Sequence, residues 1–310
     1  MKGIVFLFDG QGAFKPGVGR ELYGKYPPAQ KVIDRSSEIL GFDLKDHLWG
    51  AAAAATSGRT SVAQPAIAVV SLAYAEVLKE MGVTAEVALG HSLGEASALA
   101  YCGALSFDDG IRMIQMRGKL MEKGGKEGGM MAVVNVELPI LDQECKKISG
   151  AINQALVVAN INAPGQIVVS GSKDGLKQLT AFVSQNHGRS IPLDVGGAWH
   201  SPFLKEASEE FSQFLDKLNF VKPPVKFYSV VEEKILDDAR TIRDAFKKQM
   251  LARVNWVQAI ENLKSMGYGQ FLEIGPGKIL KDLVVKIASD IKVDTVAVYT
   301  DLQILVQVFK

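Results

Sequence analysis

The pentapeptide Gly90-His91-Ser92-Leu93-Gly94 is the feature that most constrains the fold of this chain. It stands between an apolar segment, residues 86–89, and an alanine-rich segment, residues 95–101, which we predict to be a strand and a helix. A Gly-x-Ser-x-Gly turn in this setting lifts its serine onto a sharp bend and exposes the hydroxyl. Strand, turn and helix in this order indicate an α/β fold with a parallel sheet.

Length and composition set broad limits on the class of protein. The 310 residues suggest about two domains. A 47% hydrophobic and 22% charged content is that of an ordinary globular chain. The balance of 35 basic against 34 acidic side chains gives no support for a nucleic-acid partner. Two cysteines are too few for a disulfide framework or a four-thiolate metal site, so we expect a cytoplasmic protein without a metal.

We expect no membrane partner. The apolar run Ile4 to Phe8 stops at Asp9, well short of the ~18 residues that a membrane span needs, and it suits a buried strand instead. Residues 64–81 are apolar nearly all round at helical spacing, which predicts a buried helix. No segment resembles a membrane span or a signal peptide.

A glycine-rich link at residues 124–129 separates the first part of the chain from a segment with a clear order of elements. Residues 130–195 are predicted to form strand, helix, strand, strand, helix and strand, which is the ferredoxin-like β-α-β-β-α-β unit. The sequence therefore predicts a large, discontinuous α/β domain, residues 1–128 and 196–310, with a hydrolase-like core. A small ferredoxin-like domain, residues 129–195, is inserted into it.

Ser92 is the candidate nucleophile, and it needs a base. Of the four histidines, His200 is the leading candidate because it stands in a loop of small residues before a predicted helix. His47 is expected at the surface, His187 at a helix end, and His91 in packing or support. The free N–H of Leu93, at the start of the helix, can stabilise a developing oxyanion. No acid at a marked strand end is evident to orient the histidine.

Arg117 rises from an apolar stripe on a helix that begins after Ser106. Its apolar neighbours at three or four residues' distance are Met113, Ile114, Leu120 and Met121. A partly buried arginine needs an anion. The anion could be an acidic side chain of the protein, in an internal salt bridge, or a substrate carboxylate, which a guanidinium binds with two hydrogen bonds. In a third possibility only the aliphatic part of the Arg117 side chain is buried and the guanidinium reaches solvent.

Together these pieces resemble the malonyl-CoA:acyl carrier protein transacylases, the acyltransferase family of fatty-acid and polyketide synthesis. The similarity runs across nearly the whole chain. It is carried by Gly10-Gln11-Gly12, residues 90–95, Arg117-Gly118, residues 160–166, Gly197-Ala198-Trp199-His200-Ser201, Gln249 with Trp256, and Glu273-Ile274-Gly275-Pro276-Gly277.

The resemblance implies a role for each site residue. Ser92 would accept the acyl group, His200 would act as base and later as acid, and the main-chain carbonyl of Gln249 would orient His200. The amides of Gln11 and Leu93 would form the oxyanion hole, and Arg117 would pair with the malonyl carboxylate. The acyl pocket would be bordered by Met121, Asn162 and Trp199.

The resemblance also implies the substrates, which are malonyl-CoA and the phosphopantetheine thiol of acyl carrier protein, with coenzyme A as product and no permanently bound cofactor. The large ring of Trp199 would crowd a methyl branch, which favours malonyl over methylmalonyl. Lys119, Lys123, Lys126 and Arg189 are candidates for a basic rim that meets an acidic carrier protein. The chain departs from the family at Asp9, where proline is usual, and at Ala252-Arg253, where Asn-Pro is usual.

Three other functions remain open at this stage. A serine hydrolase of coenzyme A or carrier-protein thioesters would share the turn around Ser92. A malonyl transacylase that serves a malonate decarboxylase would look much the same. A non-catalytic carrier-protein docking subunit is the third alternative, and the retained Ser92, His200 and Arg117 count against it.

Overall fold

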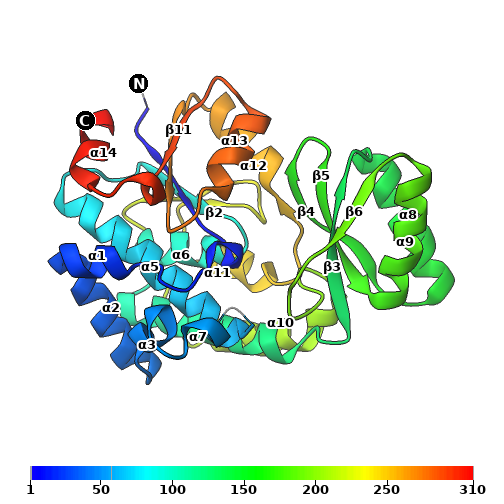
Figure 1. Cartoon of the computed structure of the whole chain (residues 1–310), viewed down its shortest axis with the longest axis horizontal. Coiled ribbons are helices and arrows are strands. Elements are labelled where there is room, and N and C mark those ends of the chain that lie inside the picture. The colour runs from blue at the N-terminus through cyan, green and yellow to red at the C-terminus, as the bar shows by residue number, and fades with distance from the viewer. Residues whose placement is uncertain (1, 57, 310) are drawn as a thin grey trace.

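A six-stranded sheet forms the centre of the larger part of the molecule (Figure 1). The computed structural model describes residues 2–56 and 58–309. The strand order is β11-β10-β1-β2-β7-β8, and every neighbouring pair is parallel except β7 and β8. The strands are β1 (Val5–Phe8), β2 (Val87–Gly90), β7 (Lys226–Ser229), β8 (Lys234–Leu236), β10 (Gln270–Ile274) and β11 (Lys292–Thr295). The predicted α/β class with a parallel sheet is confirmed.

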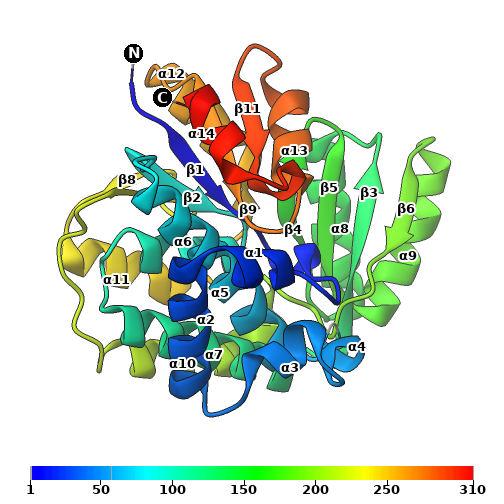
Figure 2. The same ribbon diagram turned by 60° about the vertical axis from the view of Figure 1, so that its left-hand side comes forward.

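Helices cover both faces of this sheet, which explains why β1 is apolar throughout. Helices α12 and α13 lie on one face and α5 and α6 on the other (Figure 2). Val5 and Leu7 belong to the core on the side of α12 and α13, and Phe6 and Phe8 to the core on the side of α5 and α6. The helices of this part are α1 (Arg20–Lys25), α2 (Pro27–Leu40), α3 (Leu44–Trp49), α4 (Ala53–Thr56), α5 (Thr60–Glu80), α6 (Leu93–Tyr101), α7 (Phe107–Lys123), α10 (Lys205–Leu215), α11 (Ala239–Lys248), α12 (Trp256–Ser265), α13 (Ile279–Ile287) and α14 (Leu302–Phe309).

Helix α5 is long and apolar enough to cross a membrane by length and composition, contrary to the expectation that no segment resembles a span. However, 83% of its most apolar window is buried inside the protein. Its neighbours include α2 and α7, and its side chains belong to the main core. The helix is apolar all round because it is the central helix of this core, as the sequence predicts for residues 64–81.

The small sheet has the strand order β6-β3-β5-β4-β9. Its elements are β3 (Gly128–Val134), α8 (Leu138–Ile152), β4 (Leu156–Ala163), β5 (Gln166–Ser172), α9 (Lys173–Gln185), β6 (Arg189–Pro192) and β9 (Val254–Asn255). Helices α8 and α9 cover its outer face (Figure 1). The first six elements confirm the predicted β-α-β-β-α-β order.

Strand β9 was not predicted. It comes from the second half of the chain and pairs in parallel with β4, so it joins the small sheet to the large part. Two residues are too few to show a strand pattern in a sequence. The division into residues 1–128 with 196–310 and residues 129–195 remains a prediction, and residues 1, 57 and 310 of it lie outside the described residues.

Strand β11 ends at Thr295, whose hydroxyl accepts a hydrogen bond from the N–H of Ala297 at 3.2 Å and starts a single turn of 3-10 helix, Val296–Val298. A threonine that caps the following turn ends a strand in this way.

Candidate active site

Ser92 lies on the sharp turn between β2 and α6. Its backbone has φ 55° and ψ −102°, a strained conformation for a residue with a side chain. The glycines on either side make the turn possible: a Cβ atom on Gly94 would lie 1.9 Å from the carbonyl oxygen of Phe8, and one on Gly90 would lie 2.0 Å from the carbonyl carbon of Gly94. The structure thus holds the predicted turn in the predicted place.

His200 makes a hydrogen bond with Ser92, as predicted for the base. The serine Oγ lies 2.7 Å from Nε2 of His200. The other ring nitrogen, Nδ1, lies 3.0 Å from the carbonyl oxygen of Ala252. The tautomer that fits both contacts has Nδ1–H donating to Ala252 and Nε2 accepting the serine O–H. The other three histidines do not contact Ser92 in this way.

Two main-chain carbonyls act on the ring of His200: that of Gln249, which was predicted, and that of Ala252, which was not. The carbonyls of Ala252 and Gln249 both favour the protonated ring of His200, with Ala252 first. The Gln249 side chain acts elsewhere, since its Nε2 donates to the carbonyl oxygen of Ser92 at 2.8 Å. Gln249 therefore holds the nucleophile's turn with its side chain, while its carbonyl acts on the base.

Burial lowers the pKa of His200 to about 3, and the positive charge of Arg117 and the nearby His91 contribute to the shift. A histidine with this pKa is neutral at physiological pH, so its Nε2 is free to accept a proton from Ser92. Nε2 of His200 therefore has the lone pair that base catalysis requires, although no carboxylate in the part of the chain that the structure describes orients the ring.

This lowered pKa predicts a pH profile for the first chemical step. Because His200 stays neutral, the rate of Ser92 acylation should not fall as the pH is lowered from about 8 to about 5, whereas an ordinary histidine loses its base function near pH 6.5. This rate is measured in single-turnover reactions that are stopped by acid, with the acylated protein quantified by mass spectrometry. A fall with a midpoint near 6.5 would contradict the assignment.

The control for that profile is Glu95→Gln. Burial raises the pKa of Glu95 to about 7, so Glu95 also titrates in this range. Its carboxylate accepts hydrogen bonds from the N–H of Val230 at 2.9 Å and from the Ser229 hydroxyl at 3.3 Å. The glutamine amide keeps an acceptor for the N–H of Val230 but has no proton to lose in this pH range. A change of rate with pH that persists in Glu95→Gln therefore does not come from Glu95.

Arg117, on α7, is completely buried beside the nucleophile. Its Nε and Nη2 donate to Oε1 of Gln249 at 3.1 and 3.0 Å, and Nη1 donates to Oε1 of Gln64 at 2.8 Å. Nη2 also lies 3.3 Å from the Oγ of Ser92. Among the described residues, no carboxylate oxygen lies within 4 Å of this guanidinium. Neither the internal salt bridge nor the solvent-reaching stem is present.

The charge of Arg117 is therefore held in place without a contacting counter-ion. Burial lowers its pKa to about 10, an effect that the more distant Glu95 partly opposes, so the guanidinium is still charged at neutral pH. Neutral amide oxygens orient the guanidinium but do not cancel its charge. This arrangement suits a bound anion close to Ser92.

Sequence reasoning missed Gln64, which fixes the guanidinium together with Gln249. Its one signal is a polar side chain within the apolar run 62–70 of α5, where it is 1% exposed. Glu95 was missed too, although it is an acid in an alanine-rich helix directly after the serine turn. A polar residue on a wholly apolar helix needs a polar partner in the fold.

The two predicted oxyanion amides begin short helices. Leu93 is the first residue of α6, and Gln11 is the first residue of a 3-10 turn, Gln11–Ala13. Within residues 2–56 and 58–309, neither N–H donates to a protein acceptor. Free N–H groups at helix starts are suited to an oxyanion.

A cavity of about 290 Å³ opens onto Ser92 and His200. It is lined by loop and helix residues of the large part, among them Gln11, Trp199 and Leu280, and by strand residues of the small sheet, among them Met130, Asn160, Asn162 and Val168. Asn162 contacts the site through His91, whose Nε2 lies 2.8 Å from Oδ1 of Asn162. His91 also packs edge-on against Trp256, in the supporting role that was predicted for it.

Met121 does not line this cavity, contrary to the prediction. It is 1% exposed and lies behind Gln64, whose Nε2 approaches its sulfur at 3.4 Å. Gln64 in turn accepts a hydrogen bond from Nη1 of Arg117.

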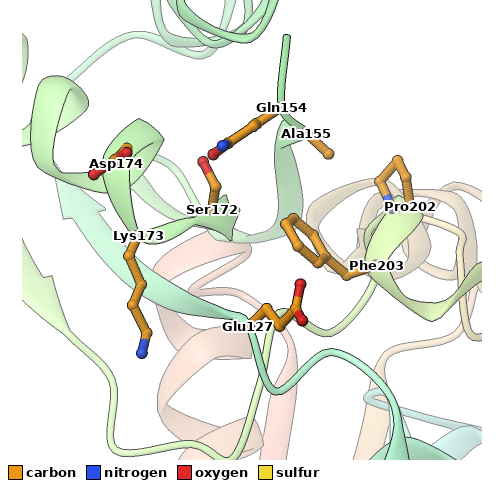
Figure 3. Close-up of a pocket in the computed structure, with 8 residues that line it drawn as sticks. All are labelled: Glu127, Gln154, Ala155, Ser172, Lys173, Asp174, Pro202 and Phe203. Carbon is orange, nitrogen blue, oxygen red and sulfur yellow. The ribbon is translucent and has the colours of Figure 1, made fainter. Parts of the chain in front are cut away.

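A second cavity, of about 540 Å³, lies away from this site, where the small sheet meets the segment after His200 (Figure 3). Its lining includes Glu127, Lys173, Asp174 and Phe203, and the hydroxyl of its Ser172 caps α9 by accepting from the N–H of Gly175. No histidine lines it, so it holds no pair like Ser92 and His200. In the described part of the chain, no group of three or more His, Cys, Asp or Glu side chains is placed to hold a metal ion.

Comparison with known proteins assigns the chain to a family. A family model described as "Acyl transferase domain" matches residues 5–301. The chain belongs to this acyl transferase family. The malonyl CoA-acyl carrier protein transacylase of Bacillus subtilis is 34% identical over 313 residues, which cover 100% of this chain and 98% of that protein.

Solved structures of acyl transferases have the same fold. The malonyl CoA-acyl carrier protein transacylase of Clostridium perfringens is 32% identical with a TM-score of 0.92, covering 98% of this chain and 96% of that one. A malonyl-transacylase solved in complex with its type II PKS acyl-carrier protein is 29% identical with a TM-score of 0.93, covering 99% of each chain.

Proposed function

We propose that this acyl transferase moves a malonyl group from malonyl-CoA to the phosphopantetheine thiol of acyl carrier protein through an ester on Ser92. The observation that carries the proposal is the buried Arg117, which has no contacting carboxylate among the described residues and lies 3.3 Å from the nucleophilic Oγ. A substrate with a carboxylate close to its reacting carbonyl supplies the missing anion, and malonyl has this form. The names of the similar transacylases support the same substrate.

The first step forms the acyl-enzyme. Nε2 of His200 takes the proton of Ser92 as Oγ attacks the thioester carbonyl of malonyl-CoA. The N–H groups of Gln11 and Leu93 donate to the oxyanion of the tetrahedral intermediate. The carbon–sulfur bond then breaks, and the coenzyme A thiolate takes the proton from His200. Arg117 holds the malonyl carboxylate throughout this step.

The second step reverses the roles of the groups. His200 takes the proton of the phosphopantetheine thiol, whose sulfur attacks the malonyl ester. The carbon–oxygen bond breaks, and Ser92 leaves with the proton that His200 returns. This chemistry uses side chains and backbone amides of the chain only, so we propose that no permanently bound cofactor takes part.

The partner and the cellular location are also proposals. The structure of a similar transacylase with its acyl-carrier protein supports a carrier-protein partner. Lys119, Lys123, Lys126 and Arg189 are exposed and would form the basic rim, with no nucleic acid or membrane as partner. The two cysteines are free and buried, as is usual in the reducing cytoplasm.

The Trp199 ring is proposed to set the size limit for the acyl group. It is 8% exposed and lines the cavity beside His200. A methyl branch on the malonyl group would have to fit against this ring in a cavity of about 290 Å³. The proposed substrate is therefore malonyl rather than methylmalonyl.

The experiment that tests the function separates transfer from hydrolysis. Purified protein is mixed with malonyl-CoA and either holo or apo acyl carrier protein, and malonyl-carrier protein and free malonate are quantified. Rapid formation of malonyl-carrier protein with the holo form alone is the expected result. Release of malonate at the same rate without carrier protein would favour a serine hydrolase, and no reaction at all would favour a docking subunit.

A further inference from the structure

Asp9 is a buried carboxyl group at the wall of the catalytic cavity, and it takes no part in the two steps above. It follows β1 directly and is 1% exposed. The next two residues are Gly10 and Gln11, so Asp9 stands two residues before one of the two proposed oxyanion amides. A buried acid in this place needs an explanation, because an unpaired carboxyl group is costly inside a protein.

The loop after β10 is built around this carboxyl group. The N–H of Gly277 donates to Oδ2 of Asp9 at 2.7 Å. A Cβ atom on Gly275, whose φ is 148°, would lie 2.4 Å from the same oxygen, and one on Gly277 would lie 2.8 Å from it. The glycines of the Gly275-Pro276-Gly277 motif thus leave room for the Asp9 side chain.

The second partner of Asp9 is Glu273, which is also completely buried and shares a side-chain hydrogen bond with it. Both oxygens of Glu273 accept main-chain N–H groups at the start of α13, from Leu280 at 2.9 Å and Lys281 at 2.8 Å. A hydrogen bond between two carboxyl groups needs a proton on one of them, so a shared proton holds the Asp9 and Glu273 side chains together.

The pKa of Asp9 reflects these surroundings. Burial raises it well above its usual range, and the hydrogen bond and negative charge of Glu273 raise it further, while the N–H of Gly277 opposes the shift. Through its contacts with Glu273 and the Gly277 N–H, Asp9 connects the end of β1 to the start of α13 and to the loop before that helix.

The connection bears directly on Gln11. Gly10 is extended, with φ −82° and ψ 176°, and the 3-10 turn begins at the next residue. The turn packs against the serine turn, since a Cβ atom on Gly10 would lie 3.1 Å from the carbonyl oxygen of His91. The direction of the Gln11 N–H is thus set by where the chain leaves Asp9.

We propose that Asp9 is a positioning residue: held between Glu273 and the Gly277 amide, it fixes the turn that aims the Gln11 N–H at the oxyanion. This inference rests on the proposed function, because the oxyanion is that of malonyl transfer. It gives a role to a residue that stands where the family usually has proline.

The test compares Asp9→Asn with Asp9→Leu, two side chains of similar size. Asparagine keeps a donor for Glu273 and an acceptor for Gly277, whereas leucine keeps neither. For each variant kcat and KM for malonyl-CoA are measured with holo acyl carrier protein. The assay temperature is well below the melting temperature of the least stable variant. We expect Asp9→Asn to retain kcat within about 3-fold and Asp9→Leu to lose about 10–100-fold in kcat with KM nearly unchanged, as for a misplaced oxyanion donor.

The outcomes separate this inference from the proposed function. An inactive wild-type protein that forms no malonyl-Ser92 would refute the function itself. With an active wild type, Asp9→Leu at full kcat would overturn the positioning role. An Asp9→Asn variant that loses as much kcat as Asp9→Leu would also overturn it, because a side chain that keeps both hydrogen bonds would then not be enough for the positioning role. If Asp9→Leu does not fold, Asp9→Ala takes its place, and the Asn variant alone still decides the role of the hydrogen-bonding side chain.

Discussion

Replacement of His200 by alanine should lower the rate of Ser92 acylation by about 10²–10⁴-fold, the usual contribution of a general base. Nε2 of His200 lies 2.7 Å from the serine Oγ, and no other side chain with a neutral basic nitrogen contacts that hydroxyl in the described part of the chain. The serine would have to lose its proton to water. Single-turnover acylation with malonyl-CoA, stopped by acid and followed by intact mass, measures this rate.

His187→Ala is the matched control for that experiment. This histidine is exposed after α9, on the small sheet's side, and has no contact with Ser92. Its replacement should leave acylation at the wild-type rate. A His200→Ala variant that acylates within about 3-fold of wild type would show that another group accepts the serine proton, and the two-step mechanism would need a different base.

Replacement of Arg117 by alanine should lower the preference for malonyl-CoA over acetyl-CoA by about 10²–10³-fold, because a site built for a charged group discriminates strongly against substrates that lack it. Wild-type Arg117 offers a buried positive charge that the malonyl carboxylate can pair with and the acetyl methyl cannot. Without the guanidinium, the malonyl carboxylate enters a buried site unpaired, at a high cost. The ratio of the two kcat/KM values is the measurement.

This ratio is chosen because Arg117→Ala also removes hydrogen bonds to Gln64 and Gln249 and will reduce stability. A smaller folded fraction lowers both rates equally and leaves the ratio unchanged. Arg117→Lys is the matched control: it keeps the charge but cannot bind two oxygens in a fixed plane, so it should retain part of the preference. A ratio unchanged from wild type in Arg117→Ala would remove the carboxylate-binding role.

Local patterns predicted the parts of the site that local chemistry determines. Ser92 is placed by two glycines within two residues of it, so the turn is encoded where it stands. His200 was found as the one loop histidine in a run of small residues. Arg117 was found because it interrupts an apolar stripe, although the sequence left the identity of its anion open.

Local patterns did not predict contacts between distant segments. The Ala252 carbonyl, which was missed, is placed by the chain after α11, where Arg253 donates from Nε to the carbonyl of Val158 at 3.1 Å and forms an ion pair with Asp142. These bonds hold Arg253, the residue after Ala252, against the small domain. The family usually has proline at the position of Arg253. No pattern near residue 252 shows a partner about 100 positions away, and the same holds for Gln64, which contacts Arg117 across 53 positions.

The most direct test of the mechanism is the mass of the intact protein after brief mixing with malonyl-CoA in the absence of carrier protein. We expect one added malonyl group, located on Ser92 by peptide mapping, lost on addition of holo acyl carrier protein, and absent from Ser92→Ala. A wild-type protein that transfers malonyl to carrier protein without ever carrying the group, or a Ser92→Ala variant that still acquires it, would contradict the acyl-enzyme mechanism.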